Sequence, residues 1–99
     1  MEFLVEFDVE VPGGTDEAEM ERRNRAESVA AAGLAADGHL VRLWRPAAAA
    51  DNPAAVGLYA ADSRAVLDEL LRALPLADWM RVRIVPLEPH PNDPGQRPR

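Results

Sequence analysis

Two kinds of residue in this sequence could do chemistry, and the first is a set of arginines expected on strands or at their ends. The planar fork of an arginine side chain donates two parallel hydrogen bonds to a carboxylate, so arginine suits a site for an anionic ligand. Alternatively, Arg42, Arg81 and Arg83 would form cross-strand ion pairs with Glu6 and Asp8 on a solvated or intersubunit sheet face. Spacing alone does not choose between the two interpretations or among the candidates, which are Arg42, Arg45, Arg81 and Arg83.

The second is Glu27, which is expected in the middle of a helix beside small residues. Ser28 and then Ala30, Ala31 and Ala32 follow it, and small neighbours leave room for a ligand next to the carboxylate. A carboxylate that borders such a crevice has a raised pKa and can act as a general base near neutral pH. The alternative is a surface glutamate, because most acidic side chains on helices are solvated.

Several other chemistries are excluded by what the sequence lacks. It has no Cys, which rules out disulfides, Cys-type zinc sites, iron–sulfur clusters and thiol catalysis. His39 and His90 are far apart and neither has a partner at metal-ligand spacing, so we predict no metal site. The sequence contains no glycine-rich phosphate-binding motif, and Pro12-Gly13-Gly14 is typical of a turn.

Length and charge restrict the class of protein further. The 99 residues suit one small domain, and eleven arginines without any lysine, against seventeen acidic residues, give a net charge of −6, which disfavours nucleic-acid binding. No segment reaches the roughly 18 to 20 apolar residues that span a membrane, and Met1-Glu2-Phe3 lacks the basic region of a signal peptide. We therefore expect a cytoplasmic protein without membrane contact. Eighteen residues are alanine, so large core side chains are few and we expect a homo-oligomer.

The elements that must position these residues follow from the hydropathy pattern. Residues 2–11 alternate between apolar and mostly acidic side chains, which predicts a strand with one buried face. Thr15 is a suitable N-cap for a long helix that ends before Asp37-Gly38, and Asp62-Ser63 caps a shorter helix over residues 64–74. The remaining strands, with an alanine-rich loop at 46–53, are predicted at 39–45, 54–60 and 81–87.

This order, βαββαβ, predicts an α+β fold of the split βαβ type, in which a four-stranded antiparallel sheet carries both helices on one face. The strand residues expected to face the helices are Phe3, Val5, Phe7, Val9, Val41, Leu43, Val56, Leu58, Val82 and Ile84. On the open face aromatic and charged residues mix, so we expect the function there. Its expected members are Leu4, Glu6, Asp8, Arg42, Trp44, Tyr59, Arg81, Arg83 and Val85.

Residues 1–88 are expected to form this single domain, and residues 89–99 a separate tail. The tail holds four prolines and has no apolar pattern of its own to build a core. We predict that it packs on a neighbouring subunit.

Several fragments in a fixed order carry a family resemblance. They are the opening strand with Phe3-Leu4-Val5, the long helix with its glutamate, and the runs Arg42-Leu43-Trp44-Arg45, Leu74-Pro75-Leu76 with Trp79-Met80, and Pro86-Leu87 before His90-Pro91. Over residues 1 to about 92 the sequence thus resembles the muconolactone delta-isomerase family. The resemblance implies a ferredoxin-like fold in a dimeric α+β barrel type of assembly. It also implies a homo-oligomer, a dimer or a larger ring such as a decamer, with active sites shared between subunits.

Enzymes of that family move a proton between two carbons of a five-membered unsaturated lactone that bears a carboxymethyl group, and they need no cofactor. A proton conjugated with the lactone carbonyl is removed, the dienolate is held by hydrogen-bond donors, and the proton returns two carbons away. The resemblance implies that Glu27 is the base and proton shuttle and that Arg42 binds the substrate carboxylate or the dienolate. The substrate-binding residues that it implies are Arg45, Trp44, Tyr59, Asn24 and His90.

The sequence also departs from the family pattern. Asn24 and Ser28 stand where the family tends to have lysine, Arg42 replaces a histidine, and the loop after the second strand has become alanine-rich. These changes leave open a larger and less polar substrate. Two other functions stay open as well: a cofactor-free oxygenase or cyclase of aromatic or polyketide-type intermediates on the same scaffold, and a non-catalytic ligand-binding module. An exposed Glu27 with no adjacent cavity would favour the binding module, whereas Glu27 in a pocket with Arg or Trp from a second subunit would favour an enzyme.

Overall fold

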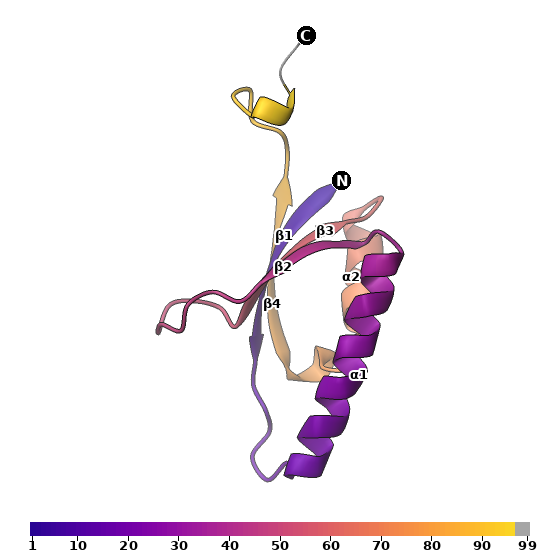
Figure 1. The fold of residues 1–99 in the computed structure, drawn as a ribbon, viewed down its shortest axis with the longest axis vertical. Helices are drawn as coiled ribbons and strands as arrows, with labels where there is room; N and C mark the ends of the chain where they lie inside the picture. Colours follow the sequence, from indigo (N-terminus) through magenta and orange to yellow (C-terminus); the bar gives the residue numbers. More distant parts are fainter. Residues whose placement is uncertain (97–99) are drawn as a thin grey trace.

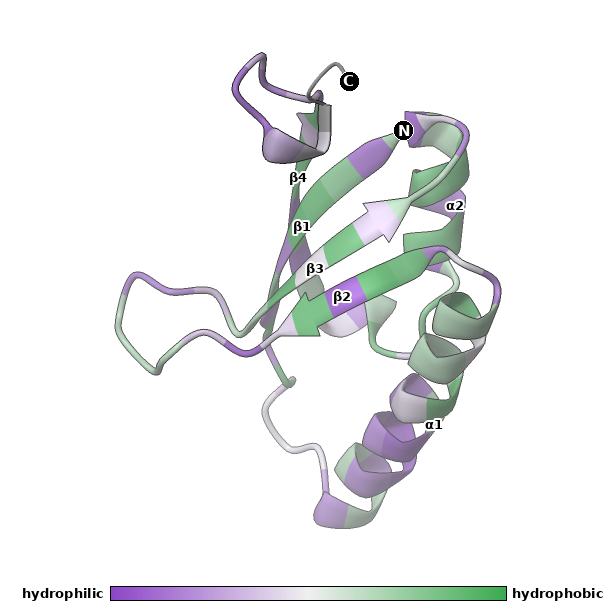
Figure 2. Ribbon diagram, turned by 45° about the horizontal axis from the view of Figure 1, so that its top comes forward, coloured by the Kyte–Doolittle hydropathy of each residue, from purple (hydrophilic) through white to green (hydrophobic). Residues whose placement is uncertain are grey.

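Four strands and two helices follow one another in the predicted order (Figure 1). The computed structural model describes residues 1–96. The strands pair antiparallel in the spatial order β2-β3-β1-β4, and both helices lie on one side of the sheet (Figure 2). This is the ferredoxin-like α+β arrangement that the sequence predicts. The elements are β1 (Glu2–Val9), α1 (Glu17–Ala36), β2 (Leu40–Trp44), β3 (Ala55–Ala60), α2 (Arg64–Arg72) and β4 (Met80–Leu87).

The ends of α1 are set by local hydrogen bonds and by one glycine. The Asp16 side chain accepts a hydrogen bond from the Glu19 N–H at 2.8 Å, whereas the Thr15 hydroxyl donates to the Pro12 carbonyl at 2.7 Å. Thr15 therefore holds the preceding turn, and its prediction as the N-cap is wrong by one residue. After the last turn, Gly38 has a φ of 82°, a left-handed conformation that glycine adopts without steric cost.

The hydrophobic core lies between the central strands and α2. Ser63 caps α2 by accepting a hydrogen bond from the Val66 N–H at 3.2 Å, which starts the helix with its apolar stripe toward the sheet. The buried cluster consists of Phe3, Val5, Phe7, Tyr59, Ala61, Leu67, Leu71 and Leu74. By contrast, α1 is described over its whole length and none of its twenty residues is buried. The long helix therefore covers the sheet without filling the space beneath it.

The side chains of β3 face the opposite way from the prediction. Tyr59 pairs with Phe3, a core residue, and so faces the helices instead of the open face. The physical reason is the space at Gly57: a Cβ there would lie 2.6 Å from Cε1 of Tyr59, so the tyrosine ring occupies the place of a side chain at that position. Val56 and Leu58, predicted to face the helices, consequently lie on the open face.

A bulge in β2 makes the prediction wrong for one further residue, Val41. The pairing with β3 shifts between Leu40 and Arg42, so Leu40 packs against the core, whereas Val41, predicted to face the helices, is 47% exposed. An extra residue on a bulged strand changes which side the neighbouring side chains take. Leu43 lies opposite Gly57 and is on the helix side, as predicted.

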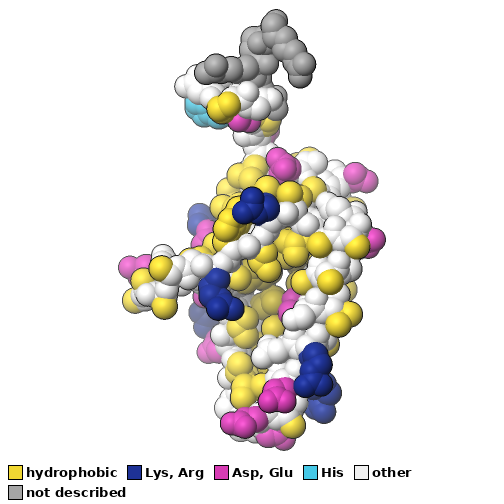
Figure 3. All heavy atoms as spheres, in the orientation of Figure 1, with side chains coloured by type: hydrophobic (Ala, Val, Ile, Leu, Met, Phe, Trp, Pro, Cys, Tyr) yellow, Lys and Arg dark blue, Asp and Glu magenta, His cyan; other side chains and the backbone are white. Residues whose placement is uncertain are grey.

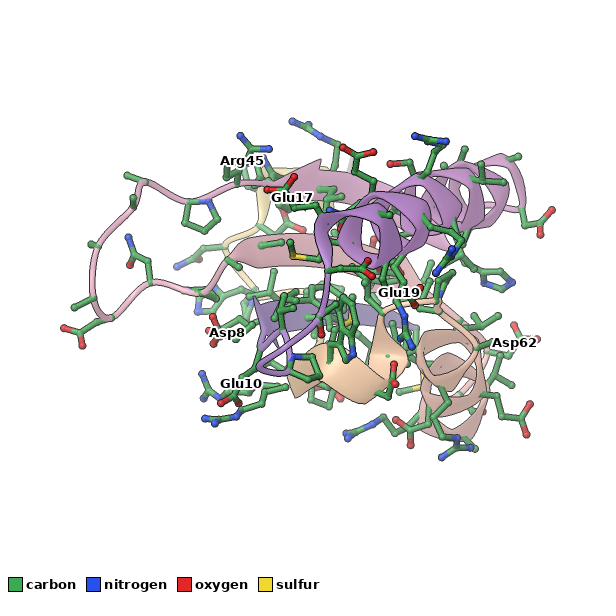
Figure 4. All side chains as sticks on the ribbon, turned by 90° about the horizontal axis from the view of Figure 1, so that it is seen from below. Asp8, Glu10, Glu17, Glu19, Arg45 and Asp62 are labelled. Atoms are coloured by element: carbon green, nitrogen blue, oxygen red, sulfur yellow. The ribbon has the colours of Figure 1, made fainter. Side chains whose placement is uncertain are left out.

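The open face of the sheet combines ion pairs with apolar side chains. Arg83 pairs with Glu6 at 3.1 Å, and Arg81 pairs at 2.9 Å with Glu10, which directly follows β1 and is labelled in Figure 4. The ion-pair interpretation is therefore confirmed for two of its three arginines, Arg81 and Arg83, although Glu10 replaces Asp8 as one acid. The apolar residues on the same face are Leu4, Val56, Leu58 and Val85.

Beyond β4 the chain runs past the end of the sheet and away from the helices (Figure 1). Residues Pro94–Gln96 form a short 3-10 turn there. The last part of the predicted tail, residues 97–99, lies outside the described residues. None of the helices within residues 1–96 is both long and apolar enough to cross a membrane.

Candidate functional site

A cavity of about 250 Å³ lies between α1 and the helix side of the sheet. Figure 3 shows the molecule hollowed there, with hydrophobic side chains inside the hollow. The cavity exists because α1 presents small residues to it where larger ones would fill the space. Its lining is apolar except for Glu27, Ser28 and Tyr59, and the larger apolar members include Phe7, Val9, Leu34, Leu43, Leu74 and Met80.

Glu27 is half-buried on the wall that α1 forms. Its Oε1 accepts a hydrogen bond at 3.0 Å from the backbone N–H of Leu76, in the segment between α2 and β4. Burial raises the pKa of the Glu27 carboxyl above its ordinary value, and the hydrogen bond from Leu76 offsets only part of that effect. The predicted crevice beside Glu27 is thus confirmed, and the alternative of a solvated surface glutamate is wrong.

Polar contacts hold α1 in place above the cavity. Arg23, one helical turn before Glu27, donates to Asp78 at 2.7 Å and to the Pro75 carbonyl at 3.2 Å, and its guanidinium lies 4.3 Å from the centre of the Trp79 ring. Arg23 also pairs with Glu19, one turn earlier on the same helix, at 3.0 Å. The spacing of Arg23 and Glu27 by four residues was the available signal that both face the same segment.

Tyr59 lies on the sheet wall of the cavity and is 4% exposed. Its ring centre lies 6.0 Å from that of Phe7, and the structure gives its hydroxyl no hydrogen-bond partner within residues 1–96. No unpartnered side-chain oxygen or nitrogen in the described part of the chain is fully buried, so the Tyr59 hydroxyl keeps some accessible surface. Burial, followed by the nearby charge of Glu27, raises the pKa of Tyr59 to about 12. The phenol is therefore a hydrogen-bond donor at neutral pH.

The structure brings Glu27 and Tyr59 together but leaves the other predicted site residues away from the cavity of the same chain. Arg42 stacks on Trp44, with 5.1 Å from the guanidinium carbon to the ring centre, and both are exposed on the open face. Arg45 directly follows β2, where the chain leaves the sheet (Figure 4).

Two further predicted residues lie on other surfaces. Asn24 is exposed on α1, and its backbone carbonyl accepts a hydrogen bond from the Ser28 hydroxyl at 3.1 Å. His90 lies in the tail, where its Nδ1 accepts a hydrogen bond from the Asn92 N–H at 3.0 Å. Among the described residues, no three histidine or acidic side chains gather in a way that could hold a metal ion.

One solved structure shares the fold of this chain but differs strongly from it in sequence. It is a 5-chloro-2-hydroxyhydroquinone dehydrochlorinase from Burkholderia phenoliruptrix, solved with 2,5-dihydroxybenzoquinone, and it shows 14% identity. The match covers 94% of this chain and 99% of that one, with a TM-score of 0.62, so it shows that the fold is shared. No curated protein matches the sequence significantly.

A nearer match is the crystal structure of a muconolactone isomerase. It has 27% sequence identity and a TM-score of 0.84, and the match covers 100% of each chain. The family model described as muconolactone delta-isomerase matches residues 1–93. Because that match spans nearly the whole sequence and the fold agrees along its full length, the chain belongs to the muconolactone delta-isomerase family.

Proposed function

We propose that this chain is a cofactor-free isomerase that moves a proton between two carbons of an unsaturated lactone or a related carbonyl compound. The observation that carries the proposal is the Glu27 carboxylate, which has a raised pKa and lies on an apolar cavity. A carboxylate in such surroundings suits a base that must later give its proton back. Membership of the muconolactone delta-isomerase family supports the same reaction class.

In the proposed reaction the Glu27 carboxylate removes a proton from a carbon conjugated with the carbonyl. The C–H electron pair becomes part of a dienolate, whose negative charge is shared with the carbonyl oxygen. The resulting carboxylic acid returns the same proton to a carbon two positions away, so the double bond moves and nothing is oxidised or reduced. The apolar walls limit exchange of that proton with water, and the Leu76 N–H holds the carboxyl group in place during both steps.

The direct test is incubation of the protein with muconolactone, followed by ultraviolet absorbance and by proton NMR in deuterated buffer. Formation of the double-bond isomer, with most of the migrating hydrogen retained, would support one-base transfer in a shielded cavity. Absence of turnover with muconolactone and with other unsaturated lactones would contradict the proposed function.

We expect the plot of kcat/KM against pH to have an acid limb whose midpoint lies above 4.5, the ordinary pKa of a glutamate. Glu27 acts as a base only when ionised, and burial shifts its pKa upward, so activity should rise with pH through this raised value. Measurement of initial rates across buffers of constant ionic strength would locate the limb. A limb at or below 4.5 would show that another group accepts the proton.

We also propose that a second copy of the chain covers the open face of the sheet. Trp44 is 42% exposed there beside Val56 and Leu58, and an apolar sheet face in water favours association. In an assembled oligomer, Arg42, Arg45, Trp44, Asn24 and His90 remain our candidates for contacting substrate from a neighbouring copy.

Removal of residues 91–99 should shift the oligomer distribution toward smaller species in analytical ultracentrifugation. The described part of this segment extends past the sheet, so we expect it to pack on another copy (Figure 1). A chain that ends at residue 96 is the control, because it retains the described part of the tail. An unaltered distribution after the longer deletion would contradict the role of the tail in assembly.

A further inference from the structure

The cavity has an unusual charge balance, and the following inference rests on the proposed function. Glu27 is the only charged residue of its lining, whose other polar members are the hydroxyl groups of Ser28 and Tyr59. Arg23 comes from the same helix, but Glu19, Asp78 and the Pro75 carbonyl already occupy its guanidinium. A ligand carboxylate inside this cavity would therefore face the negative charge of Glu27 without a cation from residues 1–96 of the same chain to offset it.

The cavity does offer a neutral hydrogen-bond donor. The Tyr59 hydroxyl has no partner within residues 1–96 and keeps some accessible surface, and its residue lines the cavity. Its pKa of about 12 keeps it protonated at neutral pH. A phenol O–H is well matched to an uncharged carbonyl oxygen, and its hydrogen bond strengthens as negative charge develops on that oxygen in the enolate.

The donor and the base come from opposite walls. Tyr59 is on β3 of the sheet, Glu27 is on α1, and both line the same cavity. The tyrosine ring is fixed because it lies over Gly57, where a Cβ would approach Cε1 to 2.6 Å. A carbonyl compound between the two walls would meet a proton acceptor on one side and a fixed donor on the other, which is the arrangement that enolisation requires.

We propose that the cavity is selective for an uncharged unsaturated lactone or enone, and that Tyr59 donates a hydrogen bond to its carbonyl oxygen while Glu27 moves the proton. The electron pair released from the C–H bond is delocalised onto the oxygen that Tyr59 holds. It flows back when Glu27 delivers its proton to the distant carbon, so Tyr59 keeps its own proton throughout.

Three substrates of closely similar structure test the selectivity: muconolactone, its methyl ester, and beta-angelica lactone, in which a methyl group replaces the carboxymethyl group. Esterification removes the negative charge and leaves the ring unchanged. We expect kcat/KM to be at least about tenfold higher for the ester than for the acid, a factor equivalent to about 1.4 kcal/mol. A preference for the free acid would overturn this inference and would indicate that a neighbouring copy supplies a cation to the cavity, with Arg42 and Arg45 as the candidates. It would leave the isomerase function in place.

The Tyr59→Phe variant tests the donor with the ester or with beta-angelica lactone as substrate. Its kcat should fall by about 10²–10³-fold, the effect of removing one donor to a developing oxyanion, with little change in KM. Phenylalanine retains the ring over Gly57, so the melting temperature should stay close to that of the wild type, which excludes a merely structural loss. Unchanged kcat in a folded variant would overturn the role of Tyr59. If the wild type turns over none of the three compounds, the proposed function itself fails, and this inference with it.

Discussion

Replacement of Glu27 by glutamine should reduce turnover by about 10²–10⁴-fold, the contribution expected of a positioned general base. Glutamine has a similar shape, and its side-chain carbonyl can still accept the hydrogen bond from Leu76. It cannot take a proton from carbon. The loss is measured as kcat on whichever lactone the wild type converts fastest, and a folded variant with wild-type kcat would remove Glu27 from the mechanism.

Thermal stability should separate this chemical effect from unfolding. Burial raises the pKa of Glu27, which means that the folded chain holds the ionised carboxylate less favourably than the unfolded chain does. That cost grows as pH rises from the unfolded pKa and is fully present above the folded pKa. A neutral glutamine removes it, so the melting temperature at pH 7 should equal or exceed that of the wild type. Glu21→Gln is the matched control, because Glu21 is on the same helix and its side chain is 72% exposed.

Replacement of Trp79 by alanine should lower the free energy of unfolding by about 3–5 kcal/mol, the range for removing a large aromatic side chain from a core. Trp79 is 7% exposed, and the Arg23 guanidinium stacks on its ring. Since α1 buries none of its own residues, this stacking is one of the few contacts that hold the helix over the cavity. Urea denaturation followed by circular dichroism measures the loss.

Trp44→Ala is the comparison for that experiment because Trp44 is the other tryptophan and is 42% exposed in a single chain. If a second copy covers Trp44, the destabilisation in this variant should depend on protein concentration, whereas that of Trp79→Ala should remain when the protein is diluted. A loss below about 1 kcal/mol for Trp79→Ala would mean that the ring contributes little to the fold, in contrast to its observed burial.

The parts of the fold that local sequence determines were predictable. The alternation in β1 identified Phe3, Val5 and Phe7 as buried, and all three are in the core. The cap of α2 and its leucines were predictable for the same reason, since an N-cap and a stripe at helical spacing involve only near neighbours. The element order then left the four-stranded antiparallel sheet as the simplest topology.

The orientation of β3 was not predictable from its own residues. By size, Val56 and Leu58 are the better candidates for the core. In the structure, however, Gly57 and Tyr59 lie on the helix side of the sheet. That choice depends on the ring packing across to β1 and on the cavity beneath α1, and both involve residues distant in the sequence. Pattern alone therefore assigned the tyrosine to the wrong face.

For the candidate site, sequence reasoning identified the carboxylate but not its surroundings. Glu27 stood out through its small neighbours, whereas the partner that holds it is a backbone N–H, which no side-chain pattern reveals. Arginines looked suited to an anionic ligand, yet Arg81 and Arg83 form ion pairs on the far side of the sheet. Which surface an arginine reaches depends on strand register, and composition does not encode it.

The hydrogen bond that the Leu76 N–H donates to Glu27 has a consequence for how the cavity can change in evolution. Leu76 holds the carboxylate through its main chain and lines the cavity with its side chain. Every residue except proline supplies that N–H, so a substitution at position 76 keeps the donor to Glu27 while it changes the lining of the cavity. Under the proposed function, such a substitution would alter the shape offered to a substrate and leave the proton-transferring carboxylate anchored.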